Sequence, residues 1–348
     1  MSETFTSLAL VPKATAPLSA KEFKTDQEVR WCPGCGDYSI LATVQSFLPE
    51  LGVKRENIAF ISGIGCSSRF PYYVDTYGMH SIHGRAPAIA TGLAITRPDM
   101  SVWVVTGDGD ALSIGGNHLI HAMRRNVNLK ILLFNNRIYG LTKGQYSPTS
   151  EEGKVTKSSP YGSLDHPFNP VSVAIGVEAT FVARTLDSDR KHLTETLRAA
   201  AAHEGTAIVE IMQNCDIFND GAWQPLKDSD TRDELLIKLA HGEPIRVGAT
   251  RAVFRDSQGA IFIGEVNAEN EADIIIHDAH AEDPSLAFAL SRMSDPVRLS
   301  NTPIGVFRSV QREVYDRQMQ AQIDDITEKK GPGSLDALLR SVDTWEIK

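Results

Sequence analysis

The sequence predicts an α/β protein built on a mostly parallel sheet with helices on both faces, followed by a C-terminal α+β extension. Apolar, β-branched runs at 101–106 and 129–134 flank a helical pattern over 115–126, which is the order of a strand, helix, strand unit. Two further apolar runs, at 58–61 and 206–212, add strands to the same sheet. A sheet of this kind binds its ligands at the carboxyl ends of its strands.

Polar residues follow two of these strands at that edge. Gly107-Asp108-Gly109-Asp110 comes directly after the strand at 101–106, and Asn135-Asn136 follows the strand at 129–134. Carboxylate and amide oxygens suit Mg²⁺ and leave room for phosphate oxygens and water. The glycines let the backbone approach a phosphate group closely. The alternative is a tight turn followed by a loop-capping Asn pair, without any ligand.

The four cysteines form a second candidate site. Cys32 and Cys35 make a Cys-x-x-Cys pair, Cys66 lies in a glycine-rich turn after the strand at 58–61, and Cys215 follows the last strand. Four thiolates suit one 4Fe-4S cluster or one structural Zn²⁺. The alternatives are that Cys66 and Cys215 are ordinary buried residues, and that the pair binds zinc or nothing.

The motifs between residues 30 and 220, taken in order, resemble the β subunit of 2-oxoacid:ferredoxin oxidoreductases, which are thiamine diphosphate enzymes. The matching segments are Cys32-Pro-Gly-Cys35, Gly63-Ile-Gly-Cys-Ser67, His83-Gly-Arg85, Gly107-Asp-Gly-Asp110, Tyr139-Gly-Leu-Thr-Lys-Gly-Gln145 and the late Cys215. The resemblance implies the thiamine-diphosphate-binding fold. Within the family, the chain looks most like a 2-oxoglutarate:ferredoxin oxidoreductase.

The resemblance also implies which residues hold the cofactors. Mg²⁺ would be held by Asp108, the side chain of Asn136 and the backbone carbonyl of Ile138. One 4Fe-4S cluster would be bound by Cys32, Cys35, Cys66 and Cys215. Thiamine diphosphate would be contacted by a larger set, namely Ile64, Gly65, Cys66, Ser67, Ser81, Ile82, His83, Gly84, Gly109, Asp110, Gly140 and Leu141. For His83, a hydrogen bond to the diphosphate and simple packing beneath it are both open.

Three residues are candidates for substrate contacts. Arg69 can pair with the substrate carboxylate through two hydrogen bonds. Lys143, with Leu141 as an apolar wall, can meet a second, distal carboxylate, which favours 2-oxoglutarate over pyruvate. A lysine at this point can equally contact coenzyme A phosphates or solvent.

The reaction implied by the resemblance is reversible oxidative decarboxylation of 2-oxoglutarate with coenzyme A, giving succinyl-CoA and CO₂, with electrons passing through the 4Fe-4S cluster to ferredoxin. The glutamate that activates the aminopyrimidine lies on an α (or fused γα) subunit, so we expect an α partner and an (αβ)₂ assembly. The alternatives are a pyruvate:ferredoxin oxidoreductase β subunit, a non-oxidative thiamine-dependent decarboxylase with structural zinc, and a non-catalytic assembly subunit.

Composition limits the other possibilities. The 348 residues include 35 Lys and Arg against 44 Asp and Glu, a balance that argues against a nucleic-acid surface. No apolar run approaches the roughly 20 residues needed to span a membrane. The N-terminus carries no recognisable export signal, and the cysteine usage suits a reducing compartment, so we expect a cytoplasmic protein.

Three regions follow from the distribution of Pro, Ser and charge. We expect residues 1–30 to form an extended arm suited to wrapping a neighbour. Residues 31–240 are expected to form the thiamine diphosphate and iron-sulfur domain, and residues 241–348 an extension with a structural or interface role. A cap over the cluster is the functional alternative for the extension. Within the domain, the Ser/Gly/Pro-rich segment 147–170 predicts a surface connection or a lid.

The extension predicts its own short elements. Strands are expected at 260–263 and 272–276, and a helix over 283–293 with Asp283 as N-cap and Pro284 at its first position. A charged amphipathic helix is expected over 309–330, and a last helix over 335–342.

Overall fold

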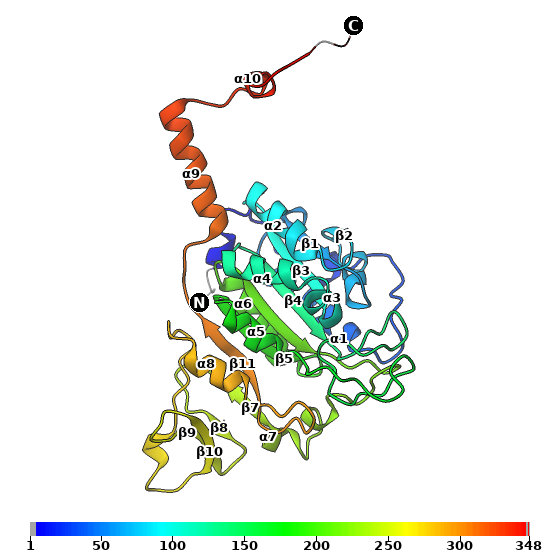
Figure 1. Ribbon diagram of the computed structural model, residues 1–348, viewed down its shortest axis with the longest axis vertical. Coiled ribbons are helices and arrows are strands. Elements are labelled where there is room, and N and C mark those ends of the chain that lie inside the picture. The colour runs from blue at the N-terminus through cyan, green and yellow to red at the C-terminus, as the bar shows by residue number, and fades with distance from the viewer. Residues whose placement is uncertain (1–4, 346, 348) are drawn as a thin grey trace.

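The centre of the protein is one eight-stranded sheet. The computed structural model describes residues 5–345 and 347, and orders the strands β2-β1-β3-β4-β6-β5-β11-β7 (Figure 1). Only β11 with β5 is antiparallel among the neighbouring pairs of this sheet, which confirms the predicted mostly parallel fold. The strands are β1 Ile58–Ser62, β2 Tyr77–His80, β3 Ser101–Gly107, β4 Lys130–Asn135, β5 Phe181–Leu186, β6 Ala207–Met212, β7 Leu236–Leu239 and β11 Thr302–Ser309.

Helices cover both faces of this sheet. Successive residues of β3 point to opposite faces, so Val102 and Val104 join one apolar core while Trp103 and Val105 join the other. Both sets are buried, which is why the central strands are apolar throughout instead of alternating. One face carries α1 Asp37–Phe47 and α6 Arg190–Ala202; the other carries α2 Ala86–Thr96, α4 Gly116–Arg125, α5 Pro170–Gly176 and α8 Ser285–Ser291.

The expected boundary at residue 240 does not divide the sheet. β11, which belongs to the predicted extension, returns to the main sheet and pairs with both β5 and β7. Only a small antiparallel sheet stands apart, with the order β10-β9-β8 and the bounds Arg246–Val247 for β8, Arg251–Arg255 for β9 and Ile261–Glu265 for β10. The segment 241–348 is therefore part insertion and part completion of the central sheet.

Several expected elements in the extension are wrong in detail. The run at 272–276 forms no strand. Its first two residues end a short 3₁₀ turn, and Ile276 makes an isolated bridge to Pro244. Pro284 is the N-cap of α8 and not its first helical residue, and the carboxylate of Asp283 accepts the backbone N–H of Ser285 at 2.9 Å.

The helix expected from residue 309 begins only at Tyr315, as α9 Tyr315–Lys330, because Ser309 belongs to β11 and residues 310–314 form an irregular connection. α10, Leu335–Leu339, follows it.

The N-terminal arm lies on its own chain. Leu8, Val11 and Phe23 are buried in the core beside α1 and α6. Isolated bridges tie Lys13 to Val53 and Lys24 to Val74. Described residues of the arm therefore close this chain's own core, and contact of the arm with a neighbour stays a prediction.

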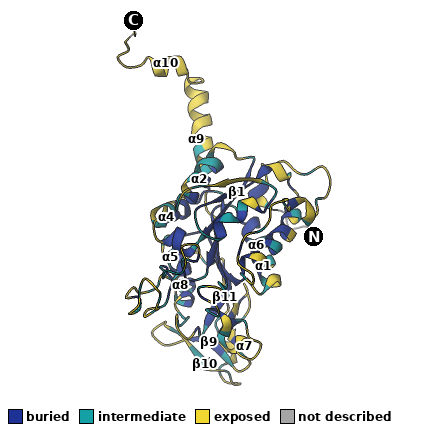
Figure 2. Cartoon of the chain, turned by 90° about the vertical axis from the view of Figure 1, so that its right-hand side faces the viewer, coloured by how far each residue is buried: buried dark blue, intermediate teal, exposed yellow. Residues whose placement is uncertain are grey.

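α9 projects from the body of the protein, and its residues are exposed (Figures 1 and 2). Its first turn is anchored at the residues before β4, where Asn128 N donates to Asp316 Oδ1 at 3.0 Å. This is the edge opposite the carboxyl ends of the strands, so α9 does not cap a cluster located there. No helix in the described part of the chain is both long enough and apolar enough to cross a membrane.

Candidate functional site

A cavity of about 50 Å³ lies at the carboxyl ends of β1, β3 and β4. It brings together most of the residues that the sequence singled out, from four separate loops. The predicted residues that line it are Ile64, Gly65, Cys66, Ser67, His83, Asp108, Gly109, Asp110, Asn136, Ile138, Gly140 and Leu141. The carboxyl edge of the parallel sheet is thus where the candidate chemistry gathers.

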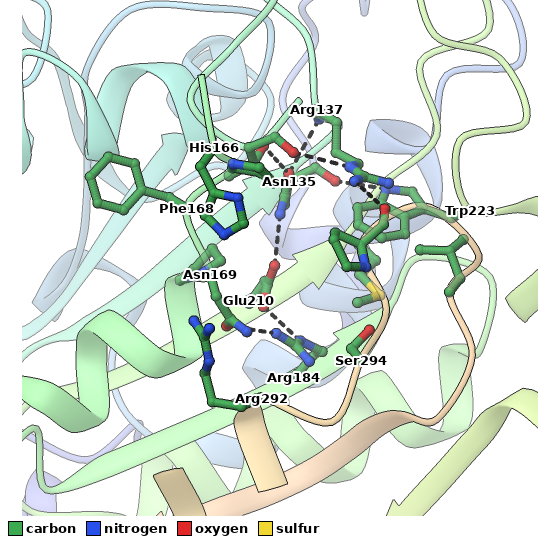
Figure 3. A pocket seen from close by; sticks show the side chains of 16 residues that line it. Asn135, Arg137, His166, Phe168, Asn169, Arg184, Glu210, Trp223, Arg292 and Ser294 are labelled. Atoms are coloured by element: carbon green, nitrogen blue, oxygen red, sulfur yellow. Dashed lines mark hydrogen bonds and ion pairs between the residues drawn. The ribbon is translucent and has the colours of Figure 1, made fainter. Parts of the chain in front are cut away.

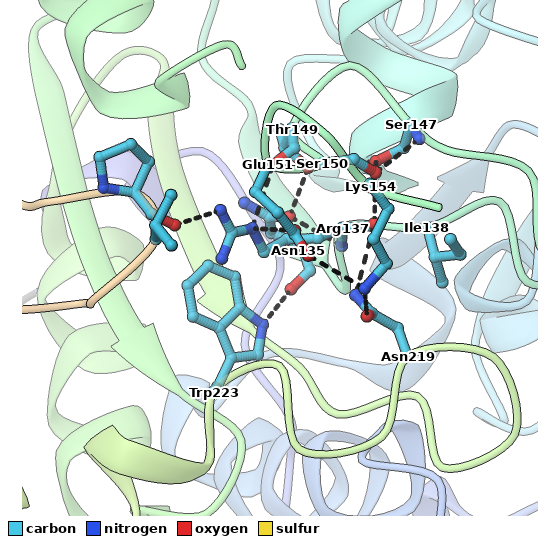
Figure 4. A network of polar contacts seen from close by, with 12 residues as sticks. Asn135, Arg137, Ile138, Ser147, Thr149, Ser150, Glu151, Lys154, Asn219 and Trp223 are labelled. Carbon is cyan, nitrogen blue, oxygen red and sulfur yellow. Dashed lines mark hydrogen bonds and ion pairs between the residues drawn. The ribbon is translucent and has the colours of Figure 1, made fainter. Parts of the chain in front are cut away.

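Asp108 is held by two hydroxyl groups from the segment after the 139–145 loop. Ser147 Oγ and Thr149 Oγ1 each donate to Asp108 Oδ2 at 2.5 Å. Figure 4 shows Ser147 and Thr149 within a wider polar network that includes Arg137 and Asn135. Burial raises the pKa of Asp108, and the two hydroxyls oppose that rise. A bound cation would relieve the cost of this buried charge, so the residue fits a Mg²⁺ ligand.

Asp110 ties the loops around the cavity together. Its Oδ1 accepts the backbone N–H groups of Ile64 at 3.1 Å and Gly84 at 2.8 Å, and lies against His83 Nδ1. Its Oδ2 accepts from Thr106 Oγ1 at 2.8 Å. With these donors, the carboxylate fixes two loops to the end of β3 and positions the residues that face the cavity.

The loop after β4 forms the opposite wall. Asn136 Oδ1 accepts the backbone N–H of Ile138 at 3.1 Å, which turns the chain so that both residues line the cavity. Tyr139 donates its hydroxyl to the carbonyl of Gly109 at 3.1 Å. A Cβ on Gly109 would strike the Tyr139 ring, so this close approach requires glycine.

Two of the cysteines border this wall. A Cβ atom on Gly140 would lie 3.5 Å from Cys215 Sγ and 3.6 Å from Cys66 Sγ. Cys35 is held nearby, since Gln213, which precedes Cys215 by two residues, donates to its Sγ at 3.3 Å. Cys32 is exposed, and its carbonyl accepts the Cys35 N–H at 3.2 Å.

Burial is the main cause that keeps the half-buried thiols neutral. It raises the pKa of Cys66 to about 12 and raises the pKa values of Cys35 and Cys215 as well. Neighbouring cysteines add to the shift at Cys35 and Cys66. In the described residues, no three His, Cys, Asp or Glu side chains already converge as a metal site. Thiolates in this place would therefore need a cation to stabilise them.

Some predicted residues do not line the cavity. Arg69 is half-buried and its Nη1 reaches only the carbonyl of Arg30, at 3.5 Å. Lys143 is exposed, with φ of 76°, at the tip of the loop whose Leu141 does line the cavity.

Three predicted thiamine contacts outside the cavity lie in the loop after β2. Ser81 donates N–H and hydroxyl to Ser62, Ile82 is exposed, and Gly84 donates to Asp110. They flank His83, which does line the cavity.

Ser147 and Thr149 are the functional residues that sequence reasoning missed. They belong to the Ser-Pro-Thr-Ser run at 147–150, inside the segment read only as a connection or lid. The closely spaced hydroxyls directly after a loop that resembles a cofactor-binding loop were the available signal. No glutamate of the described residues lines the cavity, in keeping with a base supplied by another chain.

Comparison with known proteins agrees with this geometry. Residues 63–211 match the family described as thiamine pyrophosphate enzyme, C-terminal TPP binding domain. The chain is 60% identical over 350 residues to the 2-oxoglutarate oxidoreductase subunit KorB of Mycobacterium tuberculosis, covering 100% of this chain and 93% of that protein. It is 45% identical over 198 residues to a 2-oxoacid:ferredoxin oxidoreductase subunit beta of Sulfolobus sp., which covers 56% of this chain and 65% of the relative.

A solved structure extends the similarity to the fold. It is the 2-oxoglutarate:ferredoxin oxidoreductase from Magnetococcus marinus with 2-oxoglutarate, coenzyme A and succinyl-CoA bound. The TM-score is 0.73 at 32% sequence identity, and the alignment covers 99% of this chain and 100% of the other.

Proposed function

The chain belongs to the β subunits of the 2-oxoglutarate:ferredoxin oxidoreductases, and on that premise we propose that it carries the thiamine diphosphate, Mg²⁺ and 4Fe-4S sites for oxidative decarboxylation of 2-oxoglutarate. The products are succinyl-CoA, CO₂ and reduced ferredoxin. The observation that supports this most directly is the position of Cys66 and Cys215 beside Gly140, on the wall of the cavity that Asp108 and Asn136 also line.

The residues around the cavity have different roles in binding the metal and the cofactor. Asp108, Asn136 and the carbonyl of Ile138 would hold Mg²⁺ against the cofactor diphosphate, and Ser147 and Thr149 keep Asp108 in place. Thiamine diphosphate, when bound, supplies the nucleophilic carbon and the electron sink for decarboxylation.

Gly109 and Gly140 line the cavity, and their lack of side chains lets the Tyr139 ring pack against Gly109 and the sulfurs of Cys66 and Cys215 lie beside Gly140. Ser67 and His83, from the two loops fixed by Asp110, complete the cradle.

The four cysteines would bind a 4Fe-4S cluster, which accepts electrons one at a time. This chain contributes a short route for them, because Cys66 belongs both to the ligand set and to the cavity wall. Ferredoxin would then collect the electrons at the exposed side, where Cys32 lies.

The substrate carboxylates would be met by Arg69 and Lys143. Arg69 follows Cys66 by one turn of 3₁₀ helix, and Lys143 sits on the loop that bears Leu141. Small movements of these long side chains bring cationic groups to the cavity mouth, where a dicarboxylate gains more than pyruvate does. The glutamate that activates the cofactor would come from an α subunit, in an (αβ)₂ assembly.

The test is to purify this chain together with its α partner without oxygen, and to measure coenzyme A-dependent reduction of ferredoxin with 2-oxoglutarate and with pyruvate. We expect reduction with 2-oxoglutarate, formation of succinyl-CoA and no activity for this chain alone. Preference for pyruvate would refute the role of Lys143. CO₂ release without ferredoxin reduction, from protein that contains zinc and lacks iron, would replace this proposal by the non-oxidative decarboxylase.

A further inference from the structure

A second cavity, of about 220 Å³, lies at the same edge of the sheet, over the carboxyl ends of β4, β5 and β6 (Figure 3). Its floor is formed by Asn135, Arg184 and Glu210, and its walls by Arg137 and Trp223. The space is large enough to hold several waters, and so a small organic acid. The carboxyl edge of an open α/β sheet is the usual place for a ligand.

Positive charge dominates this second cavity, although the chain as a whole carries a net charge of −9. Arg184 is neutralised, because its Nε pairs with Glu210 Oε2 at 2.7 Å and its other nitrogens reach Asn169 and the carbonyl of Pro303. Arg137 and Arg292 are not neutralised in this way. A cavity with two cationic groups in excess attracts a divalent anion.

Arg137 is buried without a close counter-ion. Its Nε donates to the carbonyl of Thr149 at 3.1 Å and its Nη2 to the carbonyl of Pro296 at 2.6 Å, while Nη1 has no hydrogen-bond partner among the described residues. The nearest carboxylate oxygen, on Glu151, is 3.9 Å away and is itself paired with Lys154 at 3.0 Å.

Arg292 complements Arg137 from the rim. It lines the same cavity, is exposed, and takes part in none of the ion pairs among the described residues. The two guanidinium groups thus approach one space from its wall and its rim, an arrangement that suits two separate carboxylates. Trp223, whose ring lies 4.9 Å from the Arg137 guanidinium, adds an apolar surface for the carbon chain between them.

Thr149 links this second cavity to Asp108. The Thr149 hydroxyl is 2.5 Å from Asp108 Oδ2 and 2.9 Å from Asn135 Oδ1, and it has one proton for these two acceptors. Asn135 in turn donates to Glu210 at 2.7 Å, on the cavity floor. An anion that fixes the Arg137 guanidinium also fixes the Thr149 carbonyl bonded to it, and so favours the arrangement in which Thr149 supports Asp108.

We propose that the cavity between Arg137 and Arg292 is a binding site for a small dicarboxylate effector, and that its occupation strengthens Mg²⁺ and cofactor retention at Asp108 through Thr149. The effector site is separate from the proposed substrate contacts, although its influence on the cofactor rests on the proposed function. By reciprocity, bound cofactor must strengthen dicarboxylate binding by the same factor.

The test is equilibrium dialysis of radiolabelled succinate against the complex of the full chain with its partner subunit, at constant ionic strength, with acetate as the monovalent control. Besides any binding at the substrate contacts Arg69 and Lys143, we expect one saturable site per chain that acetate does not compete for. Arg292→Gln should weaken succinate binding about tenfold, the loss expected for one charge-assisted hydrogen bond. Arg292→Lys should retain much of the affinity, and Arg298→Gln, an exposed arginine outside the cavity, should leave it unchanged.

The second measurement repeats the dialysis with Mg²⁺ and thiamine diphosphate present. Tighter succinate binding in the native complex, lost in Arg292→Gln, supports the coupling. Absence of saturable binding, or binding that Arg292→Gln leaves intact, would overturn the site whatever the enzymatic activity is. Succinate binding that Arg292→Gln weakens but the cofactor does not change would overturn the link through Thr149.

Discussion

Replacing Thr149 with valine removes the hydroxyl that supports Asp108 while preserving the shape of the side chain. Asp108 is buried, so water cannot easily replace the 2.5 Å hydrogen bond that is lost. A hydrogen bond to a charged group contributes about 1.5–3 kcal/mol. At about 1.4 kcal/mol for each factor of ten, Mg²⁺-dependent binding of thiamine diphosphate should weaken by about 10-fold to about 150-fold.

The pH dependence of binding gives an independent check of the same contact. Burial raises the pKa of Asp108, and the hydroxyls of Ser147 and Thr149 lower it, so Thr149→Val should raise it further. A raised pKa means that the carboxylate takes up a proton at a higher pH as the solution is acidified. Because Mg²⁺ needs the ionised form, cofactor affinity should fall with decreasing pH sooner in Thr149→Val than in the native chain.

Calorimetric titration of the metal-free chain with thiamine diphosphate and Mg²⁺, at about pH 6 and about pH 8, measures both effects. Thr156→Val, at a half-buried threonine later in the same segment whose hydroxyl accepts the Ser159 N–H rather than contacting Asp108, is the matched control. Ser147→Ala alone and combined with Thr149→Val completes a double-mutant cycle, in which losing both donors should cost more than the two single losses together. Unchanged affinity in a folded Thr149→Val protein, or an equal loss in the control, would refute the role given to Thr149.

Three further changes test other parts of the structure. Burial lowers the pKa of Lys130 to about 7. Between about pH 7 and the usual pKa of lysine, the unfolded chain is more often protonated at Lys130 than the folded chain. The free energy of unfolding should therefore rise with pH in that range, by up to about 1.4 kcal/mol per pH unit. Denaturant unfolding should show this rise in the native chain and in Lys13→Met, an exposed control, but not in Lys130→Met; equal slopes in all three would contradict it. Cys66→Ser should remove iron and ferredoxin reduction while calorimetry still detects thiamine diphosphate, and retained iron with full activity would exclude Cys66 as a ligand. Lys143→Met should raise the KM for 2-oxoglutarate about tenfold with little change in the KM for pyruvate, as expected for one lost ion pair; a parallel change in both would exclude a distal-carboxylate contact.

The sequence predicted the centre of the fold because the signals there are local. β3 and β4 are continuous apolar runs that end at Gly107 and Asn135, and parallel strands place such ends at one edge. Asp108 and Asn136 could therefore be placed near each other without knowledge of the remaining chain. The structure bears this out, since both line one cavity.

The elements that could not be predicted depend on distant partners. β11 contains Pro303 and Gly305, which weaken its strand pattern, and it is held between β5 and β7 from far along the chain. The contacts of Ser147 and Thr149 with Asp108 span 39 and 41 residues, so no local pattern of either segment contains them. Sequence periodicity reports local structure, whereas these features arise only when the sheet is assembled.

The lining of the cofactor cavity bears on the need for a partner. No glutamate of the described residues lines it. On the proposed function, this chain therefore provides one surface for the cofactor, and an α partner provides the activating glutamate.

One wall of the cavity is the 139–145 loop. It is closed by the hydrogen bond from the Tyr139 N–H to the Gln145 carbonyl at 2.8 Å, and Lys143 lies in it in a left-handed conformation that is uncommon for lysine. Asp108 is fixed from behind by Ser147 and Thr149 and need not move with that loop. On the proposed function, Asp108 held in this way beside the loop is half of a site, and the second half, including the activating glutamate, would come with the α subunit.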